Sequence, residues 1–407
     1  MKQKKALYLI VGGALVIVLA LFLSFVGDSK YLTAAKAGGD YLTSHMEEDG
    51  SFIYEYDPVE REESGSYNIL RHAGTTYALL ELFEATGDEK YLRAAESALT
   101  YLRTSSVPCP RYAGPRYAEG SGEARGSGEA SPRYAEASCI LEDNEIKLGG
   151  NGLALLALTK YMELTRSRDD LELAEGLARF IVALQAPNGR FLFFKMDGSG
   201  VSDRDFVSLY YPGEALFALA RLSTLTGERE WMEAAHRGAK WVITVRDSDT
   251  PTGDLEHDHW MLYALRELVA DDADPMYVGH AARLVSAIVA AQHRDETGEQ
   301  SEWNGGYYNP PRSTPTATRN EGLGAAHDIF TRAGDLAYTK VARDAMERGI
   351  GFTLRTQFTP RTLRRAGAAP DALGGFHEGL DDYDIRIDYV QHNISALLAF
   401  ERIRKSR

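Results

Sequence analysis

A pair of helices joined by a tight turn recurs along this chain, and this repeat constrains the fold more than any other feature. In residues 68–101, apolar residues such as Ala73, Tyr77 and Leu80 recur every three or four positions, as the buried face of a helix requires. A Thr-Gly-Asp turn follows, in which Gly87 can adopt the left-handed conformation that ends a helix, and the Asp can cap the next one. This stretch therefore predicts a helical hairpin.

The same hairpin returns four more times. Residues 210–243 copy it closely, and looser copies occupy residues 151–184, 259–291 and 320–353. The first helix of each pair is rich in small residues and apolar nearly all round, so we expect it to be buried on most sides. The second helix has a single apolar face and should lie outside. Repetition of a helix pair at this scale determines the architecture.

Two further helices complete the count. Residues 30–44 resemble an outer helix and residues 389–402 an inner one, so they form a sixth pair if the two ends of the chain meet. The prediction is an all-α fold, an (α/α)6 toroid that spans residues 28–407 as one domain. An open solenoid is the alternative, but its end repeats would need polar caps.

The N-terminus predicts a membrane anchor. Residues 6–26 are uncharged and apolar, long enough to cross a bilayer, and Lys2, Lys4 and Lys5 precede them. The positive-inside rule then puts the N-terminus in the cytoplasm. We expect residues 1–27 to form a cytoplasmic tip and a single transmembrane helix, with the toroid in the periplasm or outside the cell. A cleaved signal peptide is the alternative.

The two cysteines enclose an insertion of unusual composition. Between Cys109 and Cys139 lie Gly, Ser and Glu together with three Arg-Tyr-Ala triplets, a composition typical of disordered chain. We expect a disordered insertion at about residues 107–140. In an oxidising compartment the cysteines can close its base with a disulfide, and two unpaired thiols are the alternative.

The charge of the chain excludes one class of partner. A formal net charge of −14 argues against nucleic acid, whose binding requires Lys and Arg to neutralise phosphates. GxGxxG and P-loop patterns are absent from the sequence, so no nucleotide cofactor is predicted, and no other cofactor is expected.

The segments that lead into the inner helices, here called lead-in segments, hold the candidate site. They are long and rich in polar and aromatic residues, whereas the turns after the inner helices are short and generic. Function concentrates in irregular segments on a rigid scaffold, so we expect a site in the bowl at the inner-helix N-termini. The candidate catalytic residues are Tyr389, Tyr211, Glu214, His392, Asp388 and Asp258. The candidate substrate-binding residues are Arg386, Arg319, Arg71, His72, Tyr210, Trp260, His259 and Glu321.

Two features of these segments bear on ligands. Arg71, Arg319 and Arg386 can bind carboxylates bidentately, although each can also pair with a neighbouring Asp or Glu. The Glu-His-Asp-His run at residues 256–259 has a poor spacing for metal ligation on a helix. We therefore predict no metal site, and expect one residue of this run to face the bowl while others cap the helix.

The last lead-in segment carries a resemblance. Residues 386–394 read Arg-Ile-Asp-Tyr-Val-Gln-His-Asn-Ile, which resembles the Arg-x-Asp-Tyr-x-x-His segment near the end of glucuronyl carbon-5 epimerases. Residues 211–263 are similar to the helical C-terminal domain of that family, and the hairpins as a whole resemble the six-hairpin toroids of carbohydrate-active proteins. The resemblance implies an enzyme that acts on a polysaccharide, most specifically by epimerising a uronate at carbon 5.

That reaction assigns roles to the candidate residues. It needs two acid–base groups and a cation that stabilises the enolate-like intermediate. On this hypothesis Tyr389 and either Tyr211 or Glu214 carry protons, Arg386 or Arg319 binds the carboxylate, and His392 and Asp388 orient Tyr389.

Other functions remain open. A glycoside hydrolase would use two of Asp258, Glu214, Glu321 and Asp388, and a polysaccharide lyase would use the same bases as the epimerase. A non-catalytic protein that holds polymer during envelope assembly is the alternative from another class. The expected partners are a polysaccharide or oligosaccharide, the inner membrane and other proteins of envelope polysaccharide synthesis.

Overall fold

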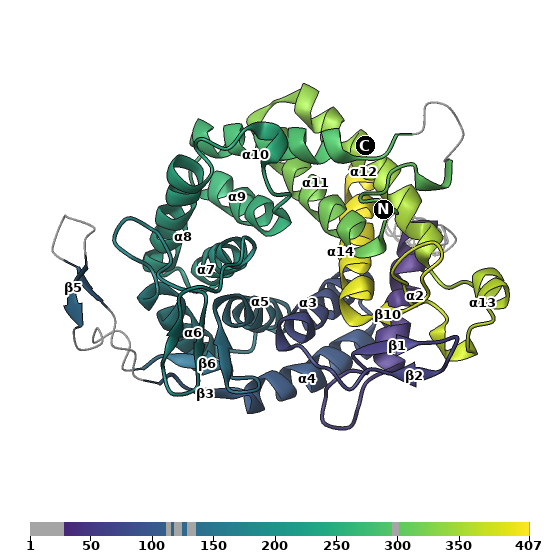
Figure 1. The fold of residues 1–407 in the computed structure, drawn as a ribbon, viewed down its shortest axis with the longest axis horizontal. Helices are drawn as coiled ribbons and strands as arrows, with labels where there is room; N and C mark the ends of the chain where they lie inside the picture. The colour runs from purple at the N-terminus through teal and green to yellow at the C-terminus, as the bar shows by residue number, and fades with distance from the viewer. Residues whose placement is uncertain (1–27, 111–114, 118–123, 128–135, 295–300, 407) are drawn as a thin grey trace, which may run out of the picture.

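Two concentric rings of helices make up the fold, seen end-on in Figure 1. The computed structural model describes residues 28–110, 115–117, 124–127, 136–294 and 301–406. Within them the inner ring consists of α3 (Ile69–Thr86), α5 (Leu148–Thr165), α7 (Tyr211–Thr226), α9 (His259–Asp271), α11 (Ser313–Ala333) and α14 (Ile387–Lys405). The outer ring consists of α2 (Lys30–Ser44), α4 (Glu89–Thr104), α6 (Leu171–Ala183), α8 (Arg229–Trp241), α10 (Pro275–Ala291) and α12 (Leu336–Thr353).

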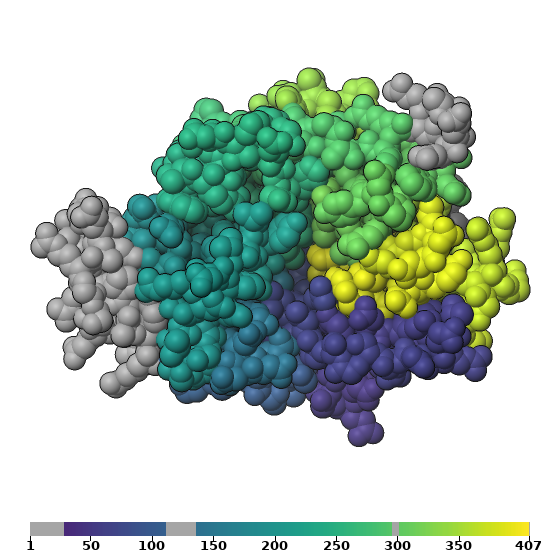
Figure 2. All heavy atoms as spheres, in the orientation of Figure 1, coloured from purple at the N-terminus to yellow at the C-terminus, as the bar shows by residue number. Residues whose placement is uncertain are grey.

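The ring closes through the two ends of the chain. Each inner helix packs against the next, and α14 contacts both α11 and α3, while α2 covers α14 from outside. Figure 2 shows the yellow C-terminal segment between the purple N-terminal segment and the green one. Ser29 donates a hydrogen bond to Glu401 Oε2 at 2.7 Å, and the rings of Tyr31 and Phe400 meet edge-on with their centres 5.0 Å apart. The predicted closed (α/α)6 toroid is confirmed.

The hairpin turns form as the sequence predicts. Asn68 begins α3 by accepting hydrogen bonds from the backbone N–H groups of Leu70 and Arg71, and Gly87 ends it with a φ of 67°. Asp88 then caps α4 by accepting from the Lys90 N–H at 3.1 Å. One boundary differs, because α11 begins at Ser313 rather than near residue 320. Its Pro315 is tolerated because the first turn of a helix needs no N–H donors.

A second kind of turn joins neighbouring outer helices. A glycine with positive φ touches a backbone carbonyl of the next outer helix in four of these turns, at Gly50, Gly189, Gly305 and Gly374. In three of them a glutamine amide also donates to that helix at 2.8–3.0 Å: Gln185 to Ala234, Gln292 to Ala345, and Gln357 to Ala34. These turns therefore bind the outer ring together.

Short antiparallel sheets lie beside the inner-helix N-termini. One has the order β10–β1–β2, formed by β10 (Ile385–Arg386), β1 (Glu55–Asp57) and β2 (Glu62–Glu63). The other has the order β7–β8–β9, formed by β7 (Glu145–Lys147), β8 (Lys195–Asp197) and β9 (Ser202–Asp203). A further short helix, α13 (Pro360–Ala366), lies on the outside of the ring (Figure 1).

The insertion has an ordered base. Strand β3 (Ser106–Pro108) pairs with β6 (Ser138–Ile140), and β4 (Pro115–Tyr117) pairs with β5 (Ala124–Ser127). Cys109 and Cys139 form a disulfide next to the first pair. Of the two alternatives for the cysteines, the structure has the disulfide. The rest of the predicted disordered insertion lies outside the described residues.

The predicted anchor, residues 6–26, also lies outside the described residues. Among the helices that the structure describes, none is both long and apolar enough to cross a bilayer.

Candidate active site

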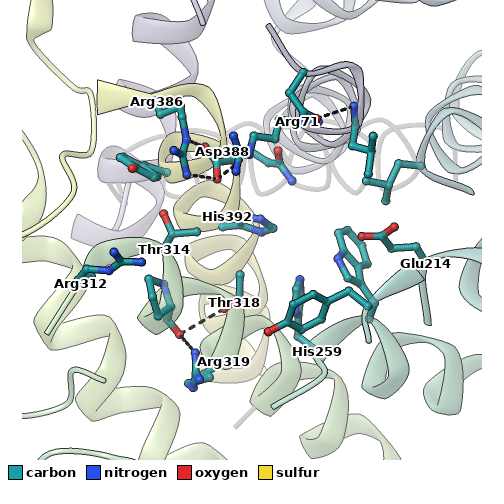
Figure 3. Close-up of a pocket in the computed structure, with 18 of the residues that line it drawn as sticks. Arg71, Glu214, His259, Arg312, Thr314, Thr318, Arg319, Arg386, Asp388 and His392 are labelled. Atoms are coloured by element: carbon teal, nitrogen blue, oxygen red, sulfur yellow. Dashed lines mark hydrogen bonds and ion pairs between the residues drawn. The ribbon is translucent and has the colours of Figure 1, made fainter. Parts of the chain in front are cut away.

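A cavity of about 390 Å³ opens at the N-terminal end of the inner ring, where the lead-in segments meet. Figure 3 shows side chains from α3, α7, α9, α11 and α14 converging on it. The predicted site residues that line it are Arg71, Tyr210, Tyr211, Glu214, His259, Trp260, Arg319, Arg386, Asp388, Tyr389 and His392. Residues far apart in the sequence are therefore brought together as expected, and His72, Asp258 and Glu321 do not line the cavity.

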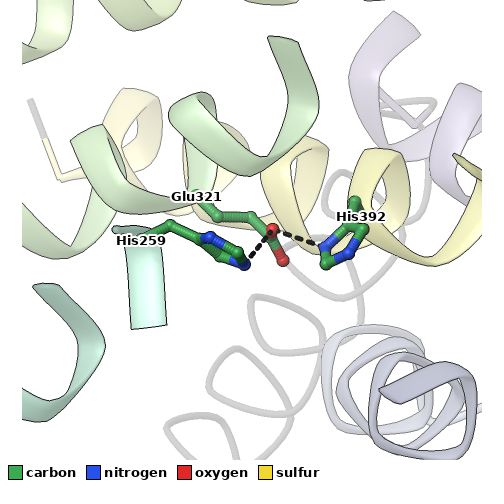
Figure 4. A group of neighbouring side chains, drawn as sticks. All are labelled: His259, Glu321 and His392. Carbon is green, nitrogen blue, oxygen red and sulfur yellow. Dashed lines mark hydrogen bonds and ion pairs between the residues drawn. The ribbon is translucent and has the colours of Figure 1, made fainter. Parts of the chain in front are cut away.

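Two histidines share one carboxylate at the floor of the cavity (Figure 4). His392 Nδ1 lies 2.8 Å from Glu321 Oε2, and His259 Nε2 lies 3.8 Å from the same oxygen. The two imidazole rings are 5.4 Å apart and nearly perpendicular. Glu321 is only 2% exposed and lies behind the histidines. His259 lines the cavity, and neither of its buried ring nitrogens has a hydrogen-bond partner among the described residues.

The environment gives the two histidines opposite protonation states. Burial lowers the pKa of His259 well below 6.5, and the nearby His392 and Arg319 lower it further. Burial alone would also lower the pKa of His392, but the charge and hydrogen bond of Glu321 outweigh it and raise that pKa. Burial raises the pKa of Glu321 to about 7 against the influence of His392. Near neutral pH, His259 is an unprotonated base while His392 and Glu321 share a proton.

The same three residues have the donor types of a metal site, with ligand atoms within 4.8 Å of one another. However, the 2.8 Å contact between His392 and Glu321 is a hydrogen bond that needs a proton between its two atoms. A metal ion would have to replace that proton. The arrangement is therefore described better as an acid–base pair, and the absence of a metal stays a prediction.

In the run at residues 256–259, one side chain faces the cavity and another caps the helix, as the sequence predicts. His259 faces the cavity, whereas Asp258 is fully buried and caps α9 by accepting from the Met261 N–H at 3.0 Å. His257 accepts a hydrogen bond from Arg319 Nε at 2.6 Å. Because these side chains serve separate purposes, they do not gather around a common ligand.

Four arginines, Arg71, Arg312, Arg319 and Arg386, line the cavity from different sides, and they are not equivalent (Figure 3). Arg386 binds Asp388 through two hydrogen bonds of 2.6 and 3.1 Å, and Arg71 Nε lies 3.2 Å from the same carboxylate. Arg312 pairs with Glu378 at 3.0 Å. Among the described residues, Arg319 has no carboxylate partner.

The cavity wall therefore carries an excess of positive charge. Arg386 also lies 3.7 Å from Glu55 Oε1, so the excess comes from Arg319, which is held by neutral groups, the His257 ring and the Pro315 carbonyl oxygen at 2.8 Å. Its guanidinium also lies 4.9 and 5.1 Å from the rings of Tyr307 and Tyr308. In a chain with a net charge of −14, a cationic cavity wall indicates an acidic ligand.

The surroundings of Tyr389 and Tyr211 do not favour the proton-carrying roles that the sequence predicts. Burial raises the pKa of Tyr389 and of Tyr211, so both hydroxyls stay protonated near neutral pH and are poor bases. Asp388 does not orient Tyr389, because it binds the two arginines, and His392 binds Glu321 instead. The Tyr389 ring lies under the Arg386 guanidinium at 4.4 Å. The tyrosines are therefore better placed to bind a sugar than to move its protons.

Glu214 is the carboxyl group in the cavity wall that lacks a cationic partner. It is 5% exposed, and its Oε2 has no hydrogen-bond partner among the described residues. Burial, with a contribution from Asp258, raises its pKa to about 8. Gly149 permits its position, because a Cβ there would collide with this carboxyl group. Glu214 is therefore a neutral acid near pH 7.

The prediction that His72 binds substrate is wrong. His72 is fully buried, its Nε2 donates to the Ala98 carbonyl oxygen at 2.9 Å, and Nδ1 accepts from the Tyr67 hydroxyl at 2.7 Å. Burial lowers its pKa to about 4. His72 thus links α3 to the outer helix α4 through a backbone carbonyl group. Glutamines form a similar bond to an outer helix in three of the turns between outer helices.

Several lining residues were missed. Gln391 could have been found, because it shares a helix face with Asp388 and His392 at helical spacing. Arg312 and Glu378 carried no such signal, because their approach depends on how two distant loops fold back over the ring.

Comparison with known proteins confirms the fold. No protein-family model matches this chain, and no curated protein matches it in sequence. Its structure is similar to that of an alpha-1,6-mannanase of Salegentibacter sp. HEL1_6, with 14% identity, a TM-score of 0.60 and coverage of 92% of this chain and 100% of that one. It is similar to a cellobiose 2-epimerase of Bacillus thermoamylovorans B4167, with 12% identity, a TM-score of 0.59 and coverage of 89% of this chain and 95% of that one. It is also similar to an unsaturated glucuronyl hydrolase specific for heparin, with 14% identity, a TM-score of 0.60 and coverage of 93% of this chain and 99% of that one.

Proposed function

We propose that this protein is a carbohydrate epimerase or isomerase that moves a proton at a carbon beside a carboxylate or carbonyl group. Epimerisation of a uronate at carbon 5 is the most specific form of this proposal. The observation that carries it is the pair of histidines, one neutral and one sharing a proton with Glu321, that face one cavity. The similarity in fold to an epimerase is compatible with it.

The proposed chemistry follows from the protonation states. His259 accepts the proton of the sugar carbon, and the electron pair of the broken C–H bond moves into the adjacent carboxylate or carbonyl group. The arginine wall stabilises the resulting negative charge. His392, supplied by Glu321, returns a proton to the opposite face of the carbon, which inverts its configuration and completes the reaction.

The cationic wall supports an acidic sugar as substrate. Arg319 is positioned by two neutral acceptors, and its Nη2, which makes no hydrogen bond among the described residues, is left for a ligand carboxylate. The resemblance of residues 386–394 to glucuronyl carbon-5 epimerases points to the same class of sugar. One protein of similar fold is named as a glucuronyl hydrolase, which acts on an acidic sugar.

Glycoside hydrolysis is the second candidate, because Glu214 is a buried, protonated acid in the cavity wall, as a general acid requires. A carboxylate base is less evident, since Asp388 is bound by two arginines. In a mannanase of similar fold, a variant with two consecutive aspartates replaced is named as inactive. None of the consecutive aspartate pairs of this chain, at residues 169–170, 271–272 and 381–382, lines the cavity that the structure describes.

We also propose that the toroid works outside the cytoplasm, tethered to the membrane. The disulfide fits an oxidising compartment, and the apolar run ends three residues before Ser29, the N-cap of α2. Ser29 contacts Glu401, which lines the opposite end of the ring from the candidate site. A tether there would turn the catalytic cavity away from the bilayer.

Deuterium uptake tests the proposed function. Residues 28–407 are incubated in heavy water with uronate-containing and neutral oligosaccharides, and products are analysed by mass spectrometry. Deuterium gained at unchanged chain length supports the proposal. Shorter chains would indicate a hydrolase or a lyase, which differ by the mass of one water, and binding without any change would indicate a non-catalytic protein.

Variants of the same protein test the assignment of roles. We expect His259→Asn and His392→Asn to lower the uptake rate by roughly 10²–10⁴-fold, the usual contribution of general acid–base catalysis. Tyr389→Phe should lower it far less. If Tyr389→Phe were the most damaging change, the tyrosine mechanism would be correct instead. Loss of activity on chelation, restored by a divalent metal, would identify the histidine pair as a metal site.

A further inference from the structure

Tyr308 has a backbone conformation that is unusual for an aromatic residue. Its φ is 76°, in the left-handed region that glycine favours. Four other non-glycine residues that the structure describes have a positive φ, but of the five only Tyr308 lines the candidate catalytic cavity. A side chain disfavours this conformation, because its Cβ comes too close to the following carbonyl oxygen. Such strain persists where the surrounding structure imposes it, and it concentrates at functional sites.

The loop that contains Tyr308 is held in place on both sides of the strained residue. His293 Nε2 donates a hydrogen bond to the Tyr308 carbonyl oxygen at 2.7 Å. The backbone N–H of Arg312 donates to the Tyr307 carbonyl oxygen at 3.1 Å, and Tyr307 is only 1% exposed. The fold therefore imposes the conformation at residue 308.

Burial of the Tyr308 ring does not explain why a tyrosine occupies this position. The residue is 53% exposed, so packing of its side chain recovers little of the cost of the strain. Its ring instead contacts cations, with the guanidinium carbon of Arg319 at 5.1 Å from the ring centre and that of Arg312 at 5.7 Å. Both distances are within the range of a cation–π interaction. These contacts are what a glycine at this position would lose.

Arg319 is held by neutral groups on its ring-facing sides and along its edge. The Tyr307 ring centre lies 4.9 Å from the same guanidinium that Tyr308 contacts. Nε donates to the His257 ring, which burial keeps neutral by lowering its pKa to about 4, and Nη1 donates to the Pro315 carbonyl oxygen. Rings and neutral acceptors fix the direction of a guanidinium without cancelling its charge, as a carboxylate partner would. The charge of Arg319 is therefore left for a ligand.

We propose that Tyr308 is a positioning residue whose strained backbone holds its ring against Arg319, so that this guanidinium keeps a fixed direction and its full charge for the carboxylate of an acidic sugar. The proposal rests on the proposed function, because it assigns the sugar carboxylate to Arg319. Arg312 already pairs with Glu378 at 3.0 Å, so the effect of the ring on selectivity acts through Arg319. The strain at residue 308 thus serves selectivity rather than folding.

Substitutions that relieve the strain test this role. We expect Tyr308→Gly and Tyr308→Asn not to lower the melting temperature, because glycine and asparagine tolerate the left-handed region. In both variants KM for uronate oligosaccharides should rise about fivefold, through loss of the cation–π contact, while kcat and KM for a neutral analogue change little. Tyr308→Phe keeps the ring and should retain the selectivity for acidic sugars.

Arg166 provides a matched control for relief of strain alone. It has a φ of 64° at the end of α5, is exposed and does not line the cavity. Arg166→Gly should likewise not lower the melting temperature, and it should leave both KM values unchanged. If Tyr308→Gly lowered the melting temperature and raised KM for acidic and neutral sugars equally, Tyr308 would have only a structural role. Unchanged KM values in Tyr308→Gly would also overturn the proposal.

A second measurement needs no substrate, so it separates failure of this proposal from failure of the proposed function. The Nε–H signal of Arg319, identified by its loss in Arg319→Gln, is followed by NMR in water. In Tyr308→Gly its chemical shift should move and its exchange with solvent should speed up several-fold, and in Tyr308→Phe both should stay the same. An unchanged signal in Tyr308→Gly would contradict the positioning role even if the protein is an epimerase. A changed signal in a protein that does not turn over any uronate would contradict the proposed function instead.

Discussion

At the scale of single residues, burial decides which groups can act as acids and bases. His259, His392 and Glu321 come from three helices, and their pKa values move apart because one carboxylate serves two imidazoles in a buried place. Tyr389 and Tyr211 have the residue type of a proton carrier but lack a partner that would lower their pKa. The chemistry thus follows the environment rather than the residue type.

Arg319 should determine the preference for acidic sugars. We expect Arg319→Gln to raise KM for uronate oligosaccharides about tenfold or more, because a hydrogen bond to a charged group contributes roughly 1.5–3 kcal/mol. KM for a neutral analogue should change little. Arg312→Gln is the matched control, since Arg312 already pairs with Glu378 at 3.0 Å. Equal losses on acidic and neutral sugars would show that Arg319 has only a structural role.

Glu214→Gln should stabilise the protein at alkaline pH. Because burial raises the pKa of Glu214 to about 8, its folded state binds the proton more tightly than the unfolded chain does. Stability from this group is complete below the unfolded pKa and is lost as pH rises through about 8. The glutamine avoids that loss, which is at most about 5 kcal/mol.

Thermal unfolding at pH 5 and pH 9 measures this effect. The melting temperature of Glu214→Gln should exceed that of the original protein at pH 9, with a much smaller difference at pH 5. Glu347→Gln, at an exposed position, serves as the control. A difference that does not depend on pH would mean that Glu214 is already charged in the folded protein.

At the scale of elements, the hairpin turns and the turns between outer helices depend on glycine for different reasons. Gly189 has a φ of 93° and also touches the Arg237 carbonyl group, whereas Gly227 has a φ of 82° with no atom near the place of a Cβ. Both conformations disfavour other residues, but only Gly189 also permits a close approach to the next helix.

Alanine at these two glycines should therefore have unequal costs. We expect Gly227→Ala to lower the free energy of unfolding by about 1 kcal/mol, the cost of a left-handed conformation. Gly189→Ala should cost about 3 kcal/mol, because the outer helix must also shift. Denaturation with urea compares the two variants, and similar costs would show that the turn can move without strain.

At the scale of the whole molecule, closure of the ring places the candidate catalytic cavity at one end and a second cavity of about 720 Å³, lined by charged side chains, at the other. The N-terminal helix α2 attaches beside the second cavity, through Ser29 and Glu401. If residues 6–26 span a membrane, the catalytic cavity faces away from it, toward polymer in the surrounding compartment.

Fractionation tests the tether. The full chain should sediment with membranes and resist extraction by alkaline carbonate, whereas residues 28–407 should stay in the soluble fraction with the same deuterium uptake. Replacing two leucines of the apolar run with arginine should release the full chain, because charge at the centre of a bilayer is costly. Full chain in the soluble fraction, or one shortened near residue 27, would contradict an uncleaved anchor.

The sequence by itself determined the architecture of this protein. The period of apolar residues, the glycine turns and the number of hairpins predict six helix pairs, because local spacing decides which face of a helix is buried. The same patterns predict the end of the ring where the cavity lies, and most of the residues that line it. His72, Asp258 and Glu321 do not line it, because in sequence a polar residue buried behind a cavity looks like one that faces it.

Only the tertiary structure decided how the chemistry is divided among these residues. The hydrogen bond between His392 and Glu321 joins residues of α14 and α11 that are distant in the chain. The sequence alone was compatible with Asp388 orienting a tyrosine, but in the folded ring Asp388 pairs with Arg386 and Arg71. Distances across a closed ring set hydrogen bonds and pKa values, and spacing along the chain does not contain those distances.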